Sequence, residues 1–202
     1  RSILRNSDRV VVLSDYMAGE AGAIWGAAPA KATKIPSGVD LERFSPRHDR
    51  AVPRRRLGLP QDQILLLAVR RLDARMGLEN LIDAMAIVEG ERKDVALLVG
   101  GRGPLEGKLA ARIAERGLLR TRLLGYVEDG DLADYYGASD LVIMPSVALE
   151  GFGLSTLEAL ASGVPVLGTP TGGTPEILSG VLPDYILEGT APDQIARGIL
   201  AK

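Results

Sequence analysis

Residues 150–158 combine residue types that could bind a phosphorylated ligand. Two glutamates, Glu150 and Glu158, stand at the ends of the segment, and two glycines near its start let the backbone bend sharply and approach a ligand closely. A helical pattern follows the glycines, and the free N–H groups at a helix start form a site for anions. Ser155 and Thr156 add hydroxyl donors. We therefore expect one ligand to contact both carboxylates and the helix start. The alternative is a tight turn that caps the helix, with Glu158 facing solvent.

Two arginines could share this site. Arg71 and Arg75 follow the continuous apolar run at residues 64–69, which predicts a buried strand. From there they could enter the same crevice and neutralise phosphates, because the planar guanidinium binds oxyanions through paired hydrogen bonds. The alternative for either arginine is an ordinary place on the surface.

A second glycine-rich segment, at residues 100–103, also lies between a predicted strand and a predicted helix. Its Gly-Gly-Arg-Gly sequence resembles a dinucleotide-binding turn, but the third glycine of that pattern would fall at Glu106. A nicotinamide-dependent oxidoreductase domain is therefore an alternative function. The chain has no cysteine and one histidine, His48, for which we expect a solvated surface position. The sequence thus predicts no metal site and no cofactor.

Short apolar runs alternate with helical patterns along the whole chain. Strands buried on both faces and separated by helices predict an α/β fold with a Rossmann-like, doubly wound parallel sheet. Ligands of such sheets bind beyond the carboxyl ends of the strands, where we expect the segments described above. The predicted strands are at residues 10–13, 33–35, 64–69, 95–99, 121–124, 141–144 and 164–167, and the predicted helices at residues 16–25, 78–88, 105–115, 132–138, 154–161, 174 onward and 194–200.

A proline-rich connection is expected at residues 45–62. It carries three prolines and many charges, including a cluster of arginines, and the prediction is a solvated loop. The arginines are Arg47, Arg50, Arg54, Arg55 and Arg56.

The bulk composition predicts one globular domain spanning residues 1–202. The formal net charge of −2 argues against binding to nucleic acid. The absence of cysteine excludes disulfides and thiolate metal sites and favours a cytoplasmic location. The longest apolar run, at residues 64–69, is far too short to span a bilayer.

Several motifs together resemble glycosyltransferase family 4, whose members are retaining enzymes of the GT-B fold. Glu150 and Glu158 match its Glu-x7-Glu motif, and Arg71-Leu72 followed by Met76-Gly77 resembles its Gly-Arg-Leu-x-x-x-Lys-Gly segment. Residues 35–46 resemble its Ile-Pro-Asn-Gly-Val-Asp…Arg-Phe…Pro stretch, with Ser37 in place of the asparagine. Further matches, in the order of the family, are at residues 100–104, 125–127, 139–140 and 162–166. The resemblance covers most of the chain.

The resemblance implies that the chain is the donor-binding, C-terminal half of a GT-B fold, with the acceptor-binding N-terminal half outside this sequence. It implies that Arg71 and the backbone of residues 153–156 bind the donor diphosphate. Glu158 would bind the ribose and Glu150 the transferred sugar, and Arg71 and Glu150 are the implied catalytic residues. The implied donor-binding residues are Arg71, Arg75, Glu150, Gly151, Phe152, Gly153, Leu154, Ser155, Thr156 and Glu158, with Tyr126, Val127 and Asp129 near the base.

The implied reaction is the retaining transfer of a hexose from a UDP-, GDP- or ADP-sugar to an acceptor, without a metal or other cofactor. This half alone is expected to be inactive, and any peripheral attachment to a membrane would be made by the N-terminal half. A non-catalytic nucleotide-sugar-binding module is the remaining alternative.

The position of the family's lysine departs from the pattern in a way that removes a charge. The lysine of the family motif falls on Met76, which cannot carry a positive charge. Either Arg75 or Arg70 could substitute for it.

Overall fold

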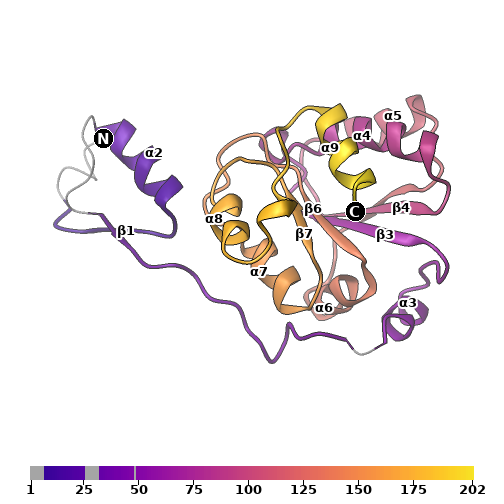
Figure 1. Cartoon of the computed structure of the whole chain (residues 1–202), viewed down its shortest axis with the longest axis horizontal. Coiled ribbons are helices and arrows are strands. Elements are labelled where there is room, and N and C mark those ends of the chain that lie inside the picture. The colour runs from indigo at the N-terminus through magenta and orange to yellow at the C-terminus, as the bar shows by residue number, and fades with distance from the viewer. Residues whose placement is uncertain (1–6, 26–31, 48) are drawn as a thin grey trace.

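The main body of the protein is a five-stranded sheet in which all neighbouring strands are parallel. The computed structural model describes residues 7–25, 32–47 and 49–202, so the predicted surface position of His48 lies outside the described residues. The strands of the sheet are β3 (Ile64–Val69), β4 (Val95–Gly100), β5 (Thr121–Gly125), β6 (Leu141–Met144) and β7 (Val166–Gly168). They lie in the order β5-β4-β3-β6-β7, which confirms the predicted doubly wound sheet (Figure 1).

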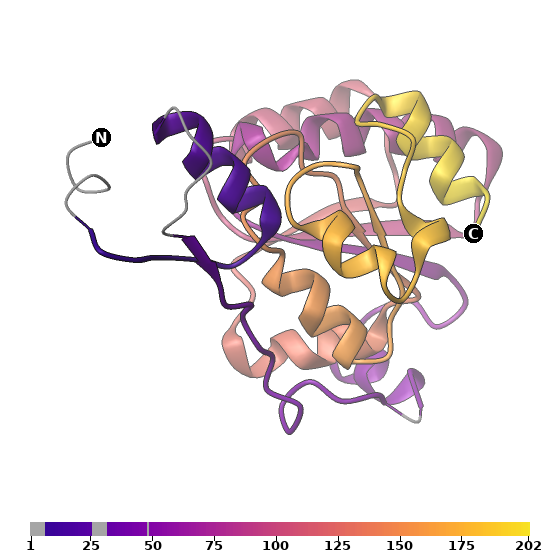
Figure 2. The same ribbon diagram turned by 60° about the vertical axis from the view of Figure 1, so that its left-hand side comes forward.

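Helices cover both faces of this sheet, because its central strands are apolar on both sides. In β3, Leu66 and Ala68 belong to the core beneath one helical layer, whereas Leu65 and Leu67 belong to the core beneath the other. The first layer contains α4 (Leu78–Glu91), α5 (Glu106–Glu115) and α9 (Pro192–Leu200), and the second contains α6 (Asp129–Ala138), α7 (Leu154–Ala161) and α8 (Thr174–Ser179). Figure 2 shows the two layers above and below the sheet.

The strand order places a topological switch point between β3 and β6. The chain leaves β3 to form β4 and β5 on one side, and then returns to form β6 and β7 on the other. Crevices for ligands form at such points, beyond the carboxyl ends of the strands. Arg70 and Arg71 directly follow β3, and Pro145 and Ser146 directly follow β6. These two segments therefore meet at the switch point.

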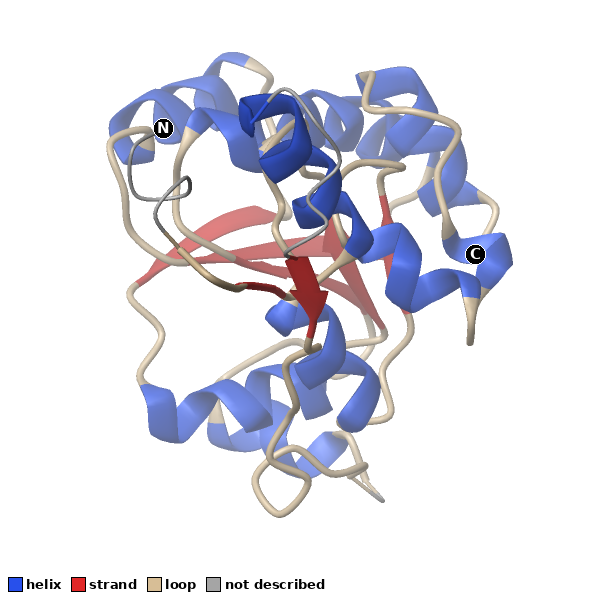
Figure 3. Ribbon diagram, turned by 90° about the vertical axis from the view of Figure 1, so that its left-hand side faces the viewer, coloured by secondary structure: helices blue, strands red, loops and turns tan. Residues whose placement is uncertain are grey.

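A second, two-stranded parallel sheet lies apart from the main one. It pairs β1 (Val10–Val12) with β2 (Ala32–Lys34), and α2 (Asp15–Trp25) connects the two strands. The hydroxyl of Ser14 accepts from the Met17 N–H at 3.0 Å and so begins α2. Figure 3 shows this unit in front of the main sheet, and the segment that follows β2 leads back to the larger body. The prediction of one domain for residues 1–202 stays a prediction.

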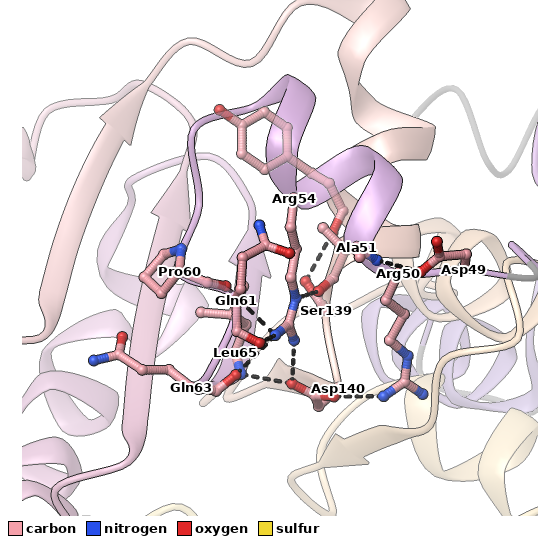
Figure 4. Close-up of polar contacts among 12 residues, drawn as sticks. Asp49, Arg50, Ala51, Arg54, Pro60, Gln61, Gln63, Leu65, Ser139 and Asp140 are labelled. Carbon is pink, nitrogen blue, oxygen red and sulfur yellow. Dashed lines mark hydrogen bonds and ion pairs between the residues drawn. The ribbon is translucent and has the colours of Figure 1, made fainter.

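The arginine-rich connection is partly helical, so the prediction of a solvated loop is wrong there. Residues Ala51–Arg56 form α3, which tolerates Pro53 because a proline within the first helical turn needs no N–H partner. Arg54 is buried, and its guanidinium donates to the Asp140 carboxylate at 2.6 Å and to the Ala138 carbonyl at 2.9 Å (Figure 4). Arg55 is exposed, as predicted. The other three arginines form ion pairs: Arg47 with Asp134, Arg50 with Asp140, and Arg56 with Asp131 and Asp134.

Among the described residues, no helix has the length and apolar character needed to cross a membrane.

Candidate functional site

A hollow of about 270 Å³ opens where β3 ends and α7 begins. We call it the β3–β6 hollow. It brings together side chains that stand far apart in the sequence, as predicted from the strand-following segments. Its lining consists of Leu13, Arg70, Arg71, Met76, Glu150, Phe152, Gly153, Leu154 and Ser155. Another hollow, of about 210 Å³, lies at the opposite ends of the strands and contains none of the predicted site residues.

The start of α7 faces this hollow because of the glycine that precedes it. Gly153 has a φ of 94°, a left-handed conformation that favours glycine, and the helix begins at the next residue. Leu154 and Ser155 line the hollow, where the first turn of the helix presents N–H groups without helical carbonyl partners. Thr156 is fully buried, and its hydroxyl oxygen lies 3.5 Å from that of Thr174. Its hydroxyl therefore faces the protein interior and not the hollow.

Glu150 is held in the hollow by two side chains. The Arg70 guanidinium donates to its Oε2 atom, and the Ser146 hydroxyl donates to the same oxygen at 2.9 Å. Arg70 also donates to the Ser146 hydroxyl at 2.7 Å. The Arg70 side chain is only 4% exposed, and its burial lowers the pKa of the guanidinium while Glu150 opposes that change. The three residues join the ends of β3 and β6 across the switch point.

Glu158 has one buried partner of its own. The hydroxyl of Tyr136, a fully buried residue on α6, donates to Glu158 Oε2 at 2.9 Å. Burial raises the pKa of Tyr136 strongly, and the negative charge of Glu158 raises it further. Because a neutral phenol is a donor, the hydrogen bond persists over the ordinary pH range. Glu158 is therefore held by a residue of α6. This differs from the capping alternative, in which Glu158 would simply face solvent.

The two arginines predicted to bind phosphate have different surroundings. The Arg71 side chain lines the hollow, is 66% exposed, and has only a loose ion pair with Asp73 at 3.8 Å. Arg75 donates from its guanidinium to the carbonyl of Leu149 at 2.8 Å, and its own carbonyl accepts from Val147 at 3.0 Å. Arg71 is therefore free to meet a ligand, whereas Arg75 braces the loop that leads to Glu150.

The residues predicted to lie near a base stand apart from this lining. Tyr126 and Val127 follow β5, two strands away from β3, and Tyr126 is 56% exposed. Asp129 begins α6, and its carbonyl accepts from Arg43 at 2.6 Å. The structure does not bring these three residues into the β3–β6 hollow itself.

The glycine-rich segment at residues 100–103 packs against the loop that follows β3. Gly101 has a φ of 130°, and a Cβ atom there would lie 1.8 Å from the Arg70 carbonyl oxygen. The Leu72 N–H donates to the Arg102 carbonyl at 3.0 Å. Close packing against the loop after β3 thus accounts for glycine at this position without a bound dinucleotide, which weakens the nicotinamide alternative.

Sequence reasoning missed several contributors to the site. Ser146 carried a usable signal, because it stands directly after an apolar run that predicts a strand. Tyr136 carried none, since an aromatic residue on the apolar face of a helix is normally a core residue. Leu13 comes from the segment between β1 and α2. Within the described residues, no group of three or more histidine, cysteine, aspartate or glutamate side chains could hold a metal ion.

Comparison with known proteins identifies the family. A family model for glycosyl transferases group 1 matches residues 49–201, and the chain belongs to this family. D-inositol 3-phosphate glycosyltransferase of Streptomyces scabiei is 35% identical over 96% of the chain and 46% of that protein. GDP-mannose-dependent monoacylated alpha-(1-6)-phosphatidylinositol monomannoside mannosyltransferase of Corynebacterium glutamicum is 31% identical over 98% of the chain and 53% of that protein.

The fold comparison agrees. The structure of sucrose-phosphate synthase from Thermosynechococcus elongatus superposes with a TM-score of 0.82 at 30% identity, covering 99% of the chain and 50% of that structure. The chain thus has the α/β, Rossmann-like architecture of GT-B glycosyltransferases. It spans about half the length of the curated relatives it matches.

Proposed function

We propose that the chain is the donor-binding half of a retaining hexosyltransferase of glycosyltransferase family 4. The observation that supports this most is the composition of the β3–β6 hollow. One exposed guanidinium, from Arg71, one fixed carboxylate, from Glu150, and the start of α7 share a single crevice at the switch point of the sheet. This set suits a ligand with a diphosphate at one end and vicinal hydroxyls at the other.

In this proposal, the diphosphate lies between Arg71 and the first turn of α7. Negative charge grows on the diphosphate as the bond between the sugar anomeric carbon and the phosphate oxygen breaks. The exposed Arg71 guanidinium and the helix N–H groups stabilise that charge. Glu150 accepts hydrogen bonds from sugar hydroxyls, and Glu158, the second glutamate of the Glu-x7-Glu motif, accepts them from the ribose. The acceptor hydroxyl oxygen then bonds to the same face of the anomeric carbon that the diphosphate leaves, which retains the configuration, and the hydroxyl proton passes to the departing phosphate oxygen.

We assign acceptor binding, and any attachment to a membrane, to an N-terminal half that precedes this unit in the whole protein. The relatives are about twice as long as the chain. The unit formed by β1 and α2 supports this assignment, because it presents an apolar hollow of about 380 Å³. Val11 and Ile24 on this unit are 57% and 50% exposed. Without that half the catalytic cleft is incomplete, so we expect the chain alone to bind a donor but not to transfer sugar.

Calorimetric titration of the chain with UDP, GDP, ADP, GDP-mannose and NAD tests the proposal. GDP-mannose belongs in the panel because the name of the Corynebacterium relative contains it. We expect saturable binding of one nucleoside diphosphate, weakened about tenfold or more by Glu158→Ala through the loss of ribose hydrogen bonds to a charged group. Glu115→Ala, an exposed glutamate on α5, is the matched control and should change nothing. Binding of NAD alone would contradict the proposal.

A further inference from the structure

The cation nearest to Glu150 is not one that the family motif supplies. In the motif that resembles residues 71–77, a glycine precedes the arginine, and that position is Arg70 in this chain. The same motif has a lysine where this chain has Met76. Compared with the motif, the chain therefore lacks a positive charge at position 76, and it has an additional one at position 70, directly before Arg71.

Arg70 is placed to act on Glu150 and not on a phosphate directly. Its side chain is 4% exposed, and the guanidinium donates to the Glu150 carboxylate and the Ser146 hydroxyl. Ser146 is itself fully buried and donates to Glu150. A buried guanidinium is tolerated only beside an anion with good hydrogen-bond geometry, so the pair is fixed in place.

The arrangement leaves one face of the carboxylate for a ligand. Both protein donors bind Glu150 Oε2, and in the described part of the chain no hydrogen bond to Oε1 is present. The Glu150 side chain is 13% exposed and lines the hollow. Arg75 forms no ion pair with Glu150 among the described residues, and its guanidinium donates to the Leu149 carbonyl instead.

We propose that Arg70 is a positioning residue, which holds the Glu150 carboxylate oriented so that its Oε1 atom accepts a hydroxyl of the donor sugar. Arg70 then governs how much the sugar adds to donor binding, and Arg71 governs how tightly the diphosphate binds. The inference rests on the proposed function, since it requires a sugar nucleotide in the β3–β6 hollow.

The test compares each nucleoside diphosphate with its sugar conjugate, using GDP with GDP-mannose and UDP with UDP-glucose in calorimetric titrations of the chain. For the pair that binds the wild-type chain, we expect Arg70→Met to weaken the sugar conjugate about tenfold or more, because a charge-assisted contact is lost, while the nucleoside diphosphate changes less than about threefold. Arg71→Met should weaken both equally. Arg70→Lys, which keeps the charge, should recover part of the loss, and Arg55→Met, an exposed arginine on α3, should change neither.

A double-mutant cycle separates positioning from a purely structural role. We compare the single variant Glu150→Gln with the double variant that carries Arg70→Met as well. Each ligand should bind the two variants with the same affinity, because Arg70 acts only through the Glu150 carboxylate. The double variant buries no unpaired charge, so it remains a test if Arg70→Met alone fails to fold. If the double variant binds both ligands more weakly than Glu150→Gln does, and by the same factor for each, then Arg70 contacts the phosphates directly. That result would overturn the proposal.

The remaining outcomes are also decisive. If Arg70→Met folds and binds both ligands as the wild-type chain does, Arg70 has no part in donor recognition. If the wild-type chain binds a nucleoside diphosphate and its conjugate with equal affinity, the proposed donor site stands and the role of Arg70 falls. If the wild-type chain binds none of these four ligands and neither ADP nor ADP-glucose, the proposed function and this inference fall together.

Discussion

The two motif glutamates differ in the partner that fixes each of them. Glu150 is held by Arg70, a cation that compensates its charge, whereas Glu158 is held by Tyr136, a neutral donor. A carboxylate with a neutral partner keeps its full negative charge for a ligand, and paired hydroxyls of a ribose are suitable donors to it. The different partners therefore match the different roles that we propose for the two glutamates.

Removing the Tyr136 hydroxyl tests this pairing with little disturbance of the core. We expect Tyr136→Phe to lower the free energy of unfolding by about 1 kcal/mol, because one hydrogen bond is lost while the ring still packs against Phe44. Nucleoside diphosphate affinity should fall several-fold, because Glu158 loses its orientation. Urea unfolding and calorimetric titration measure the two effects. Tyr135→Phe, one position earlier on α6, is the matched control, and an equal loss of affinity there would contradict the pairing.

Because the pKa of Tyr136 is raised in the folded chain, the stability difference between wild type and Tyr136→Phe depends on pH. The unfolded chain releases the phenol proton near the ordinary pKa of 10.0, while the folded chain keeps it to higher pH. The hydroxyl therefore stabilises the fold fully below pH 10 and progressively less as the pH rises above it. We expect the stability difference between wild type and Tyr136→Phe to shrink by about 1 kcal/mol between pH 9 and pH 11. Urea unfolding at the two pH values measures it, and a difference that grows with pH would contradict the assignment.

At the scale of elements, α3 is tied to the sheet by one buried arginine. The Arg54 guanidinium donates to Asp140, which also accepts from the backbone N–H of Leu65 at 2.7 Å (Figure 4). We expect Arg54→Met to lower the free energy of unfolding by about 3 kcal/mol, because it removes the buried guanidinium from Asp140 and from the carbonyls to which Arg54 donates. Arg55→Met, its exposed neighbour, should cost less than about 0.5 kcal/mol. Equal losses in urea unfolding would mean that the network in Figure 4 contributes nothing specific.

A second buried charge ties α4 to the start of β5. Glu89 accepts from the N–H groups of Leu119 and Arg120 and from the Thr121 hydroxyl, at 3.1, 3.3 and 2.9 Å. We expect Glu89→Ala to cost about 2–3 kcal/mol of unfolding free energy, since these donors lose their acceptor in the interior. Glu91→Ala, exposed on the same helix, should be nearly neutral. Thermal and urea unfolding of the two variants compare the positions directly.

These elements show which parts of the fold a sequence can predict. Continuous apolar runs such as residues 64–69 predict buried parallel strands, because periodicity and burial are local signals. The helix α3 was missed, because its proline and its charges are typical of a loop and its stability depends on Asp140, which is distant in sequence. The strand predicted at residues 164–167 is observed at Val166–Gly168. Val164 packs in the core, but the pairing of this strand with β6 begins only at Val166.

The candidate site was predictable to the level of segments but not of single side chains. Strand-following residues gather at one edge of a parallel sheet, so the meeting of residues 70–76 with residues 150–155 followed from the fold class. Neighbouring residues in an extended segment point to opposite sides. The exact end of β3 therefore decides whether Arg70 or Arg71 points inward. The sequence favoured Arg71 as the site cation, and the structure adds Arg70 as the buried one.

At the scale of the whole molecule, the small unit of β1, α2 and β2 rests on the main body through a few polar contacts near the site. The Ser14 hydroxyl donates to the Gly151 carbonyl at 2.5 Å. The Glu176 carboxylate, from α8, accepts from the N–H groups of Asp15 and Tyr16 at 2.9 and 2.7 Å. A carboxylate is favourable at this point because α2 begins there. Glu176 therefore supports the first turn of α2 and holds the unit beside the loop that contains Gly151.

Hydrogen exchange of Glu176→Ala tests this docking. We expect the amide protons of Asp15 and Tyr16 to exchange about tenfold faster or more, because each loses a charged acceptor and the first turn of α2 opens more readily. Amides of β3 and β4 should keep their protection, since the main sheet has its own core. Glu188→Ala, an exposed glutamate that pairs with Arg197, is the control. Faster exchange throughout β3 and β4 would show that the small unit and the main sheet unfold as one body, whereas a change confined to α2 would show that this unit opens locally while the five-stranded sheet stays folded.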